Sequence, residues 1–126
     1  MTSSNAAVVQ KYFQAYTDKD RAAIETVVDE TFRFSSPRDN QIDRATYFRR
    51  CWKVSEAIAG RRMIHVLADG DRVFVTYELA FTSGRIARNA EIVTLRNGKI
   101  VDVEVYFGWS IPHEAPEGGF VENGRA

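Results

Sequence analysis

The stretch Glu91–Phe107, EIVTLRNGKIVDVEVYF, most constrains the fold, because its pattern predicts two β-strands joined by a tight turn. Asn97-Gly98 is the expected turn, since both residues tolerate the positive φ angles that a type I′ turn needs twice. Apolar residues alternate with the acidic residues Asp102 and Glu104 in the second strand, so the two sets point to opposite faces. We expect this hairpin at the centre of a sheet, with the rest of the chain covering one sheet face.

The remaining segments separate into helices first and strands later. Apolar stripes at three- and four-residue spacing predict helices over residues 5–18, from the cap Asp20 to about residue 28, and over 44–58 after the cap Asp43. A short strand is expected at 31–36 before a polar loop at 37–41, and longer strands at 61–68, 72–82, 85–96 and 99–109. This order predicts an α+β fold with the helices on one face of a mostly antiparallel sheet.

Length and charge narrow the classes of function. The 126 residues suit one domain, with a core over about 5–111 and a polar tail over 112–126. The 17 basic and 17 acidic residues balance, which argues against a nucleic-acid partner. The sequence contains no polybasic cluster and no run of about 20 apolar residues, so we expect no membrane partner.

The numbers and spacing of cysteine and histidine argue against disulfide bonds and a metal site. Cys51 is the single cysteine, so the chain has no internal disulfide, and we expect a cytoplasmic protein. The two histidines are far apart in the sequence, and spaced ligand pairs are absent, so we expect no metal site. We expect no cofactor.

The chain resembles the nuclear transport factor 2-like superfamily, in particular its SnoaL-like and ketosteroid-isomerase-like domains. The resemblance rests on VVQKYFQAYTDKD, ETFRFSSP and GKIVDVEVYFG, and on the element order, over about residues 6–111. It implies a cone-shaped roll, in which three N-terminal helices pack on a strongly curved sheet and the open end holds a small organic ligand. It also implies a homodimer through the outer face of the sheet.

The ketosteroid isomerase pattern is only partly present. The resemblance places its tyrosine at Tyr12 and its second acid at Val93 or Glu91, but its base falls on Ser36, which cannot act as a carboxylate. Steroid isomerisation is therefore not expected. The epoxide hydrolase pattern has an aspartate where this chain has Gly108.

Residues 72–82 have two faces, and the residues alone leave two assignments open. Val73, Val75, Tyr77, Leu79 and Phe81 form an apolar row, and Phe74, Thr76, Glu78, Ala80 and Thr82 form a mixed row. The apolar row could lie in the core with the mixed row in water. The resemblance favours the reverse, with the mixed row in the pocket and the apolar row at the dimer interface.

Four residues are candidate catalytic groups. Glu78 and Glu91, if they face one cavity, would have raised pKa values from desolvation and could divide acid and base roles. Tyr12 is a candidate hydrogen-bond donor, and His65 a candidate titrating group in mid-strand. The plainer alternatives are solvated or arginine-paired glutamates, a core tyrosine and a rim histidine.

Further residues are expected around the ligand. The predicted pocket-lining residues are Tyr16, Ser36, Trp52, Asn89 and Phe107. Cys51 lacks an adjacent base and is interpreted as a small core residue. Glu104 and Tyr106 are expected on the outer sheet face, at the interface or in a hydrogen-bonded pair.

The sequence therefore predicts a domain that binds a small molecule. The leading hypothesis is an enzyme of the polyketide-cyclase or isomerase sort that uses acid–base chemistry without a cofactor. The alternative is a non-catalytic ligand-binding or dimerisation module of the same fold, because the fold does not fix the function.

Overall fold

A computed structural model describes the backbone of residues 2–120 and the side chains of residues 5–120. Its helices are α1 (Thr2–Asp18), α2 (Arg21–Val27) and α3 (Arg44–Arg50), and a 3-10 helix, η1, spans Trp52–Ala57. Its strands are β1 (Val28–Ser36), β2 (Asp39–Asp43), β3 (Ile58–Asp69), β4 (Arg72–Phe81), β5 (Ile86–Arg96) and β6 (Lys99–Ile111). No described helix is long and apolar enough to cross a bilayer.

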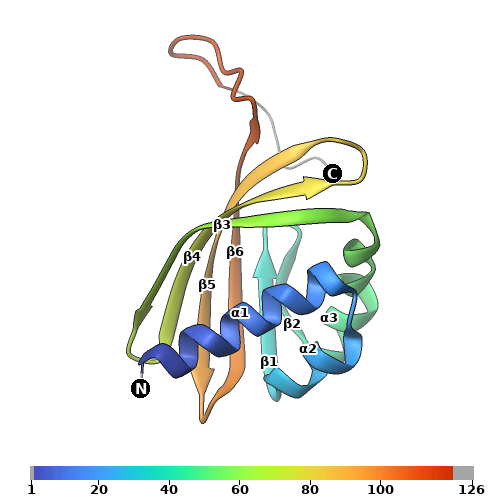
Figure 1. Ribbon diagram of the computed structural model, residues 1–126, viewed down its shortest axis with the longest axis vertical. Helices are drawn as coiled ribbons and strands as arrows, with labels where there is room; N and C mark the ends of the chain where they lie inside the picture. Colours follow the sequence, from blue (N-terminus) through green and yellow to red (C-terminus); the bar gives the residue numbers. More distant parts are fainter. Residues whose placement is uncertain (1, 121–126) are drawn as a thin grey trace.

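The six strands form one curved sheet in the order β2-β1-β6-β5-β4-β3. Only β1 and β6 pair in parallel, and every other neighbouring pair is antiparallel. Figure 1 shows α1 lying across one face of the sheet, with α2 and α3 at one end. The predicted α+β architecture, with three helices packed on a strongly curved and mostly antiparallel sheet, is confirmed. The sheet is not closed, since β2 and β3 remain at its edges.

The β5–β6 hairpin lies at the centre of the sheet, as its sequence predicts. Asn97 has φ 54° and Gly98 has φ 77°, which is the pair of positive angles that a type I′ turn requires. The apolar alternation is interrupted in β6, because the β5–β6 register shifts between Thr94 and Leu95. This shift lets Ile100 enter the core together with Val103.

Two segments differ from the prediction. The expected helix over 44–58 is α3 followed by the separate 3-10 helix η1, with Asp43 capping α3 by accepting from Thr46 N. The expected polar loop at 37–41 is a tight connection that leads directly into β2, which pairs with β1. Of the predicted tail, residues 112–120 form neither helix nor strand, and residues 121–126 lie outside the described residues.

The core lies between the helices and the concave face of the sheet. Tyr47 sits at its centre, fully buried, with its ring 4.8 Å from Phe32, 5.0 Å from Phe34 and 5.2 Å from Phe48. Further buried side chains of the core come from α1, α2 and strands β4 to β6, among them Val9, Phe13, Ile24, Val73, Val75, Val93, Leu95, Ile100 and Val103.

The apolar row of β4 faces this core, so the face assignment that the resemblance favoured is wrong. Val73, Val75, Tyr77 and Leu79 are buried. The mixed row, to which Glu78 belongs, lies on the outer face of the sheet. The hydrophobic effect decides between the two faces, because the helices cover the concave face and shield it from water.

Bulges set which side chains of β3 and β5 enter the concave face. The β3–β4 register shifts between Met63 and His65, so that Met63 faces inward opposite Tyr77 whereas His65 pairs with the outward Thr76. A second shift lies between Ala87 and Asn89. There a Cβ on Gly108 would approach Arg88 O to 2.2 Å, so only glycine allows the strands to meet this closely.

Candidate functional site

A cavity of about 240 Å³ adjoins the core, and the buried core residues Phe13, Ile58 and Leu79 contribute to its lining. Its inner wall comes from α1, β3, β4 and β5, and its mouth from the β1–β2 turn, α3 and the end of β6. Aromatic side chains form most of the apolar wall: Tyr12, Phe13, Tyr16, Phe34, Tyr77, Phe81, Phe107 and Trp109. Its volume lies just below the roughly 300–1,000 Å³ of drug-sized ligand sites, so it suits a molecule of one or two rings.

Glu91 is the carboxylate on the inner wall of this cavity. It lies on β5 between the inward-facing Val75 and Val105, and only 6% of its surface is exposed. Tyr77 donates a hydrogen bond to its Oε2, whereas its buried Oε1 has no partner among the described residues. The carboxyl group therefore has one oxygen that no described protein group satisfies, on a residue that lines the cavity.

Burial raises the pKa of the Glu91 carboxyl to about 7, although the positive charge of Arg61 and the hydrogen bond from Tyr77 both act to lower it. Desolvation dominates because water no longer stabilises the ionised form. A carboxyl group that titrates near neutral pH can both accept and return a proton under ordinary conditions, which suits a general acid–base role.

Arg61 is the second charged group of the inner wall. It follows the start of β3, and its guanidinium lies 4.6 Å from the centre of the Phe13 ring and 4.4 Å from that of Tyr77. Its buried Nε and Nη1 have no hydrogen-bond partner among the described residues. Arg61 and Glu91 influence each other electrostatically but form no direct ion pair, so both keep polar atoms free.

Three tyrosines form a separate hydrogen-bonded group beside the cavity. The Tyr47 hydroxyl bonds to that of Tyr12 at 2.9 Å and also to that of Tyr16. Burial is the main cause that raises the pKa of each hydroxyl, and the Glu91 charge adds to the effect at Tyr12 and Tyr16. All three therefore remain protonated and can act as donors, but not as bases, at neutral pH.

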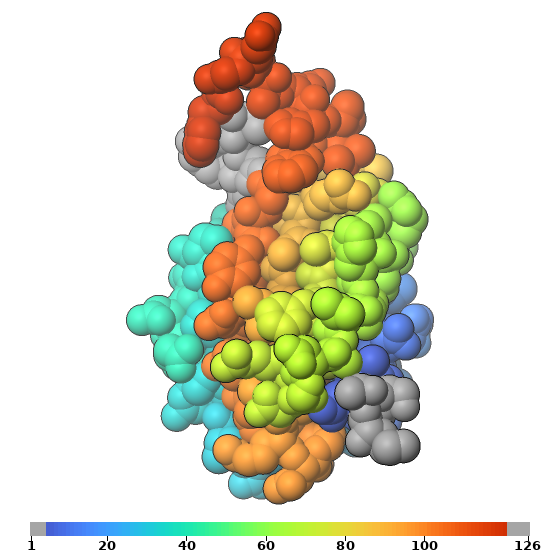
Figure 2. All heavy atoms as spheres, turned by 90° about the vertical axis from the view of Figure 1, so that its left-hand side faces the viewer, coloured from blue at the N-terminus to red at the C-terminus, as the bar shows by residue number. Residues whose placement is uncertain are grey.

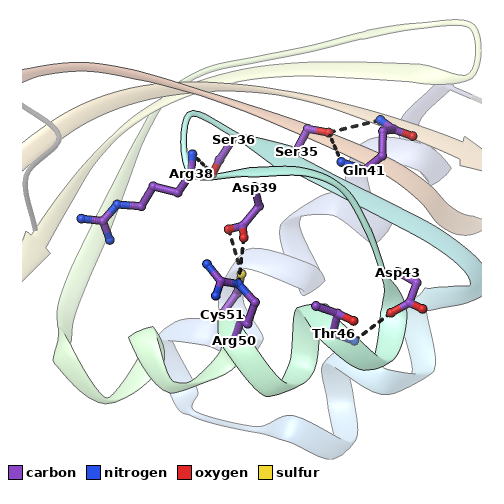
Figure 3. Close-up of polar contacts among 9 residues, drawn as sticks. All are labelled: Ser35, Ser36, Arg38, Asp39, Gln41, Asp43, Thr46, Arg50 and Cys51. Carbon is purple, nitrogen blue, oxygen red and sulfur yellow. Dashed lines mark hydrogen bonds and ion pairs between the residues drawn. The ribbon is translucent and has the colours of Figure 1, made fainter.

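A polar cluster at the mouth links the β1–β2 turn to α3 (Figure 3). Arg50 Nε lies 2.8 Å from Asp39 Oδ1, and Cys51 Sγ lies 4.0 Å from Asp39 Oδ2. Ser36 Oγ accepts a hydrogen bond from the backbone of Arg38 at 3.0 Å. Burial and the Asp39 charge raise the pKa of the Cys51 thiol to about 11, so it stays a neutral thiol.

The structure brings together most, but not all, of the predicted site residues. Glu91 and Tyr12 line the cavity, as do the predicted pocket residues Tyr16, Ser36, Asn89 and Phe107. Trp52 is not in the lining. It packs instead behind Tyr16, at 4.9 Å between ring centres.

Glu78 and His65 lie on the outer face of the sheet, and their predicted place in the cavity is wrong. Glu78 pairs with Arg62 at 3.1 Å and Arg88 at 3.5 Å. His65 is exposed and bonds to Thr76 Oγ1 at 2.6 Å. The physical reasons are the inward apolar row of β4 and the bulge in β3, which together turn both side chains away from the core.

Sequence reasoning missed Arg61 and Tyr77. The resemblance favours Tyr77 in an interface row, yet its hydroxyl is the donor to Glu91, whereas the hydroxyl of Tyr12 bonds to Tyr47. A polar hydroxyl inside an otherwise aliphatic row was the available signal for Tyr77. Arg61 gave none, since an arginine next to another arginine is typical of an exposed strand end. No group of His, Cys, Asp and Glu suited to a metal ion occurs among the described residues.

Comparison with known proteins agrees with this architecture. The SnoaL-like domain model matches residues 9–103, and the chain belongs to this family. No curated protein is significantly similar to the chain.

Solved structures show the same fold at low sequence identity. A nuclear transport factor 2-like protein of unknown function from Burkholderia xenovorans is 22% identical over 97% of both chains, with a TM-score of 0.71. A proposed ketosteroid isomerase from Kribbella flavida is 18% identical over 99% of this chain and 93% of its own, with a TM-score of 0.73. A designed protein with a curved β-sheet is 16% identical over 86% and 88%, with a TM-score of 0.75.

The titration of Glu91 predicts how stability depends on pH. The folded-state pKa of about 7 lies above the ordinary value of 4.5, so the native protein holds this proton more tightly than the unfolded chain. This contribution to stability is full below pH 4.5 and is lost as the pH rises through about 7. The loss amounts to about 3 kcal/mol at high pH.

Glu91→Gln stays neutral, so it should melt at a higher temperature than the wild type at pH 8 and at a similar temperature at pH 5. Differential scanning calorimetry measures both. Glu78→Gln is the matched control on the outer face, where a small loss at both pH values is expected. A melting temperature of Glu91→Gln that falls below the wild type at pH 8 only would show that an ionised Glu91 stabilises the fold through Arg61.

Proposed function

We propose that this protein is an acid–base enzyme that moves a proton within a small one- or two-ring carbonyl compound, with Glu91 as the proton-transferring group. The observation that carries the proposal is a buried carboxyl of pKa about 7, with one unpartnered oxygen, on a residue that lines an aromatic cavity. Groups with strongly shifted pKa values in clefts are concentrated at active sites.

The cavity walls supply the other parts of such a reaction. Ionised Glu91 would take a proton from a carbon next to the carbonyl, and negative charge would develop on the carbonyl oxygen. The guanidinium of Arg61 would hold that oxygen, since its unpartnered N–H groups are fixed before the substrate binds. Tyr77 orients Glu91 through its hydrogen bond. Protonated Glu91 would then return the proton to another atom, which completes an isomerisation or assists ring closure.

Family membership is consistent with this function but does not decide it. A non-catalytic binding domain could use the same fold, and it would not need a titrating carboxyl group in its cavity. The burial of Glu91 carries a desolvation cost that a purely binding cavity could avoid with a neutral residue. This cost favours the enzyme.

Proton exchange tests the proposal without knowledge of the natural substrate. The probe is 2-tetralone, a two-ring ketone whose C1 protons exchange with solvent through an enolate. In D₂O the wild type should accelerate loss of the C1 proton NMR signal, with a rate that rises as the pH passes about 7. Glu91→Gln should lower the accelerated rate by roughly 100-fold or more, which is the usual contribution of a general base.

Glu78→Gln is the control, because it makes the same chemical change on the outer face. It should keep the wild-type exchange rate. Exchange by the wild type no faster than in buffer, or equal exchange by Glu91→Gln, would contradict the enzyme and favour the binding module.

We also propose that the protein forms a homodimer through the outer face of the sheet. Figure 2 shows this face, with parts of β1, β6, β5, β4 and β3 side by side. Leu67 is 66%, Phe74 37% and Tyr106 53% exposed on it. Phe74 lies opposite both Leu67 and Ile92, so these residues form a continuous apolar area of the kind that marks interfaces. Tyr106 donates to Glu104 at 3.0 Å beside it.

Phe74→Glu should convert the dimer to a monomer, because it places a charge in the centre of this area. Light scattering coupled to gel filtration measures the mass. Glu30→Gln, an exposed change on β1, should leave the dimer intact. A monomeric wild type at micromolar concentration would refute the dimer.

A further inference from the structure

The cavity differs from the rest of the molecule in its charge. Four arginines, Arg38, Arg50, Arg61 and Arg85, contribute to its lining, against the two carboxylates Asp39 and Glu91. The whole chain carries no net charge. Positive charge is therefore concentrated around an otherwise aromatic cavity, which raises the local concentration of negatively charged small molecules.

At the mouth, the arginines are already in contact with other side chains or exposed to solvent. Arg50 is paired with Asp39 at 2.8 Å. Arg85 lies 4.5 Å from the centre of the Phe81 ring, and Arg38 is exposed. These groups can steer an anion toward the cavity but are not fixed around a single position inside it.

Inside the cavity, Arg61 is fixed and unsatisfied. Its contacts with the ring faces of Phe13 and Tyr77 hold the guanidinium in place, but they do not use its in-plane N–H groups. Nε and Nη1 are buried without a partner among the described residues. Nε and Nη1 lie on different edges of the guanidinium, so each can donate separately to a ligand oxygen, and the positive charge favours a negatively charged oxygen.

Glu91 does not fill this role, although it is close enough for its pKa to respond to Arg61. The two side chains form no direct ion pair, and Oε1 of Glu91 is also without a partner among residues 5–120. The unpaired atoms of the two groups together indicate a position for ligand atoms that accept from Arg61 and exchange a proton with Glu91.

We propose that the natural ligand is an organic acid of one or two rings, which is already an anion at neutral pH and binds Arg61 through its carboxylate or enolate oxygen. This names the substrate class of the proposed enzyme, and it rests on the proposed function for the location of the site. The aromatic walls contact the rings, and the arginines at the mouth favour entry of the anion. A neutral compound of the same shape leaves the Arg61 donors unpaired and binds more weakly.

Isothermal titration calorimetry with two matched probes tests the class of ligand. The probes are 2-naphthoate and its neutral counterpart 2-naphthamide at pH 7. The wild type should bind 2-naphthoate more tightly. Arg61→Met, which keeps most of the side-chain length, should weaken 2-naphthoate by roughly 10- to 100-fold, the range expected for hydrogen bonds to a charged group. Its affinity for 2-naphthamide should change by less than about threefold.

Arg62→Met is the matched control, since Arg62 is adjacent in sequence but pairs with Glu78 on the outer face. It should leave both affinities unchanged. Arg61→Lys keeps the charge without the planar guanidinium, so it should retain part of the preference for 2-naphthoate, and it serves if Arg61→Met fails to fold. Titration with the enolate of 1,3-cyclohexanedione separates acidic enols from carboxylates, and Arg61-dependent binding of either anion supports the proposal.

Absence of Arg61-dependent binding for both anions, or equal weakening of 2-naphthoate and 2-naphthamide in Arg61→Met, would overturn the proposal. These outcomes differ from failure of the proposed enzyme. Arg61-dependent anion binding without Glu91-dependent proton exchange would leave an organic-acid binding protein, whereas exchange without anion preference would leave an enzyme for neutral ketones.

Discussion

The site depends on the desolvation of the Glu91 carboxyl group. The inward face of β5 carries this carboxyl into an aromatic cavity, where the hydroxyl of Tyr77 is its hydrogen-bond partner and Arg61 the nearby positive charge. Desolvation outweighs both stabilising effects, so the group titrates near neutral pH instead of staying ionised. The same surroundings leave one carboxyl oxygen and two guanidinium nitrogens without protein partners among the described residues. Unpaired polar groups such as these suit a reaction site better than a packed core.

The sheet makes this arrangement possible through its register. Tyr77, Asn89 and Phe107 lie opposite one another on three neighbouring strands, and the next row places Glu91 between Val75 and Val105. Side chains in one row of a sheet share a face, so these two rows present polar groups to the same cavity. Gly108 allows the close approach of Arg88 O that the shifted register of β5 and β6 requires there, and Gly108 N in turn donates to Asn89 Oδ1 at 3.3 Å.

Much of the fold could be predicted from the sequence, because local sequence signals determine it. The Asn97-Gly98 turn, the cap Asp43 and the segregation of helices and strands each depend on a few neighbouring residues. The face of each strand was not accessible in the same way. The alternation of side chains along a strand places Tyr77 and Glu78 on opposite faces but does not determine which of them faces the core. A register shift of one residue exchanges the two faces.

The bulge between Met63 and His65 is one such shift, and no residue in the sequence marks it. Arg61 was missed for a related reason, since only the packed structure shows that it contacts Phe13 and Tyr77 from within the cavity.

The central claim is that Glu91 is a buried carboxyl that exchanges its proton near neutral pH. Carbon-13 NMR of protein labelled at the glutamate side-chain carboxyl measures this directly, with the Glu91 signal assigned by its loss in Glu91→Gln. The chemical shift of this signal should titrate with a midpoint near pH 7. A midpoint at or below the ordinary glutamate value of 4.5 would contradict the account, because burial would then not destabilise the ionised form of Glu91.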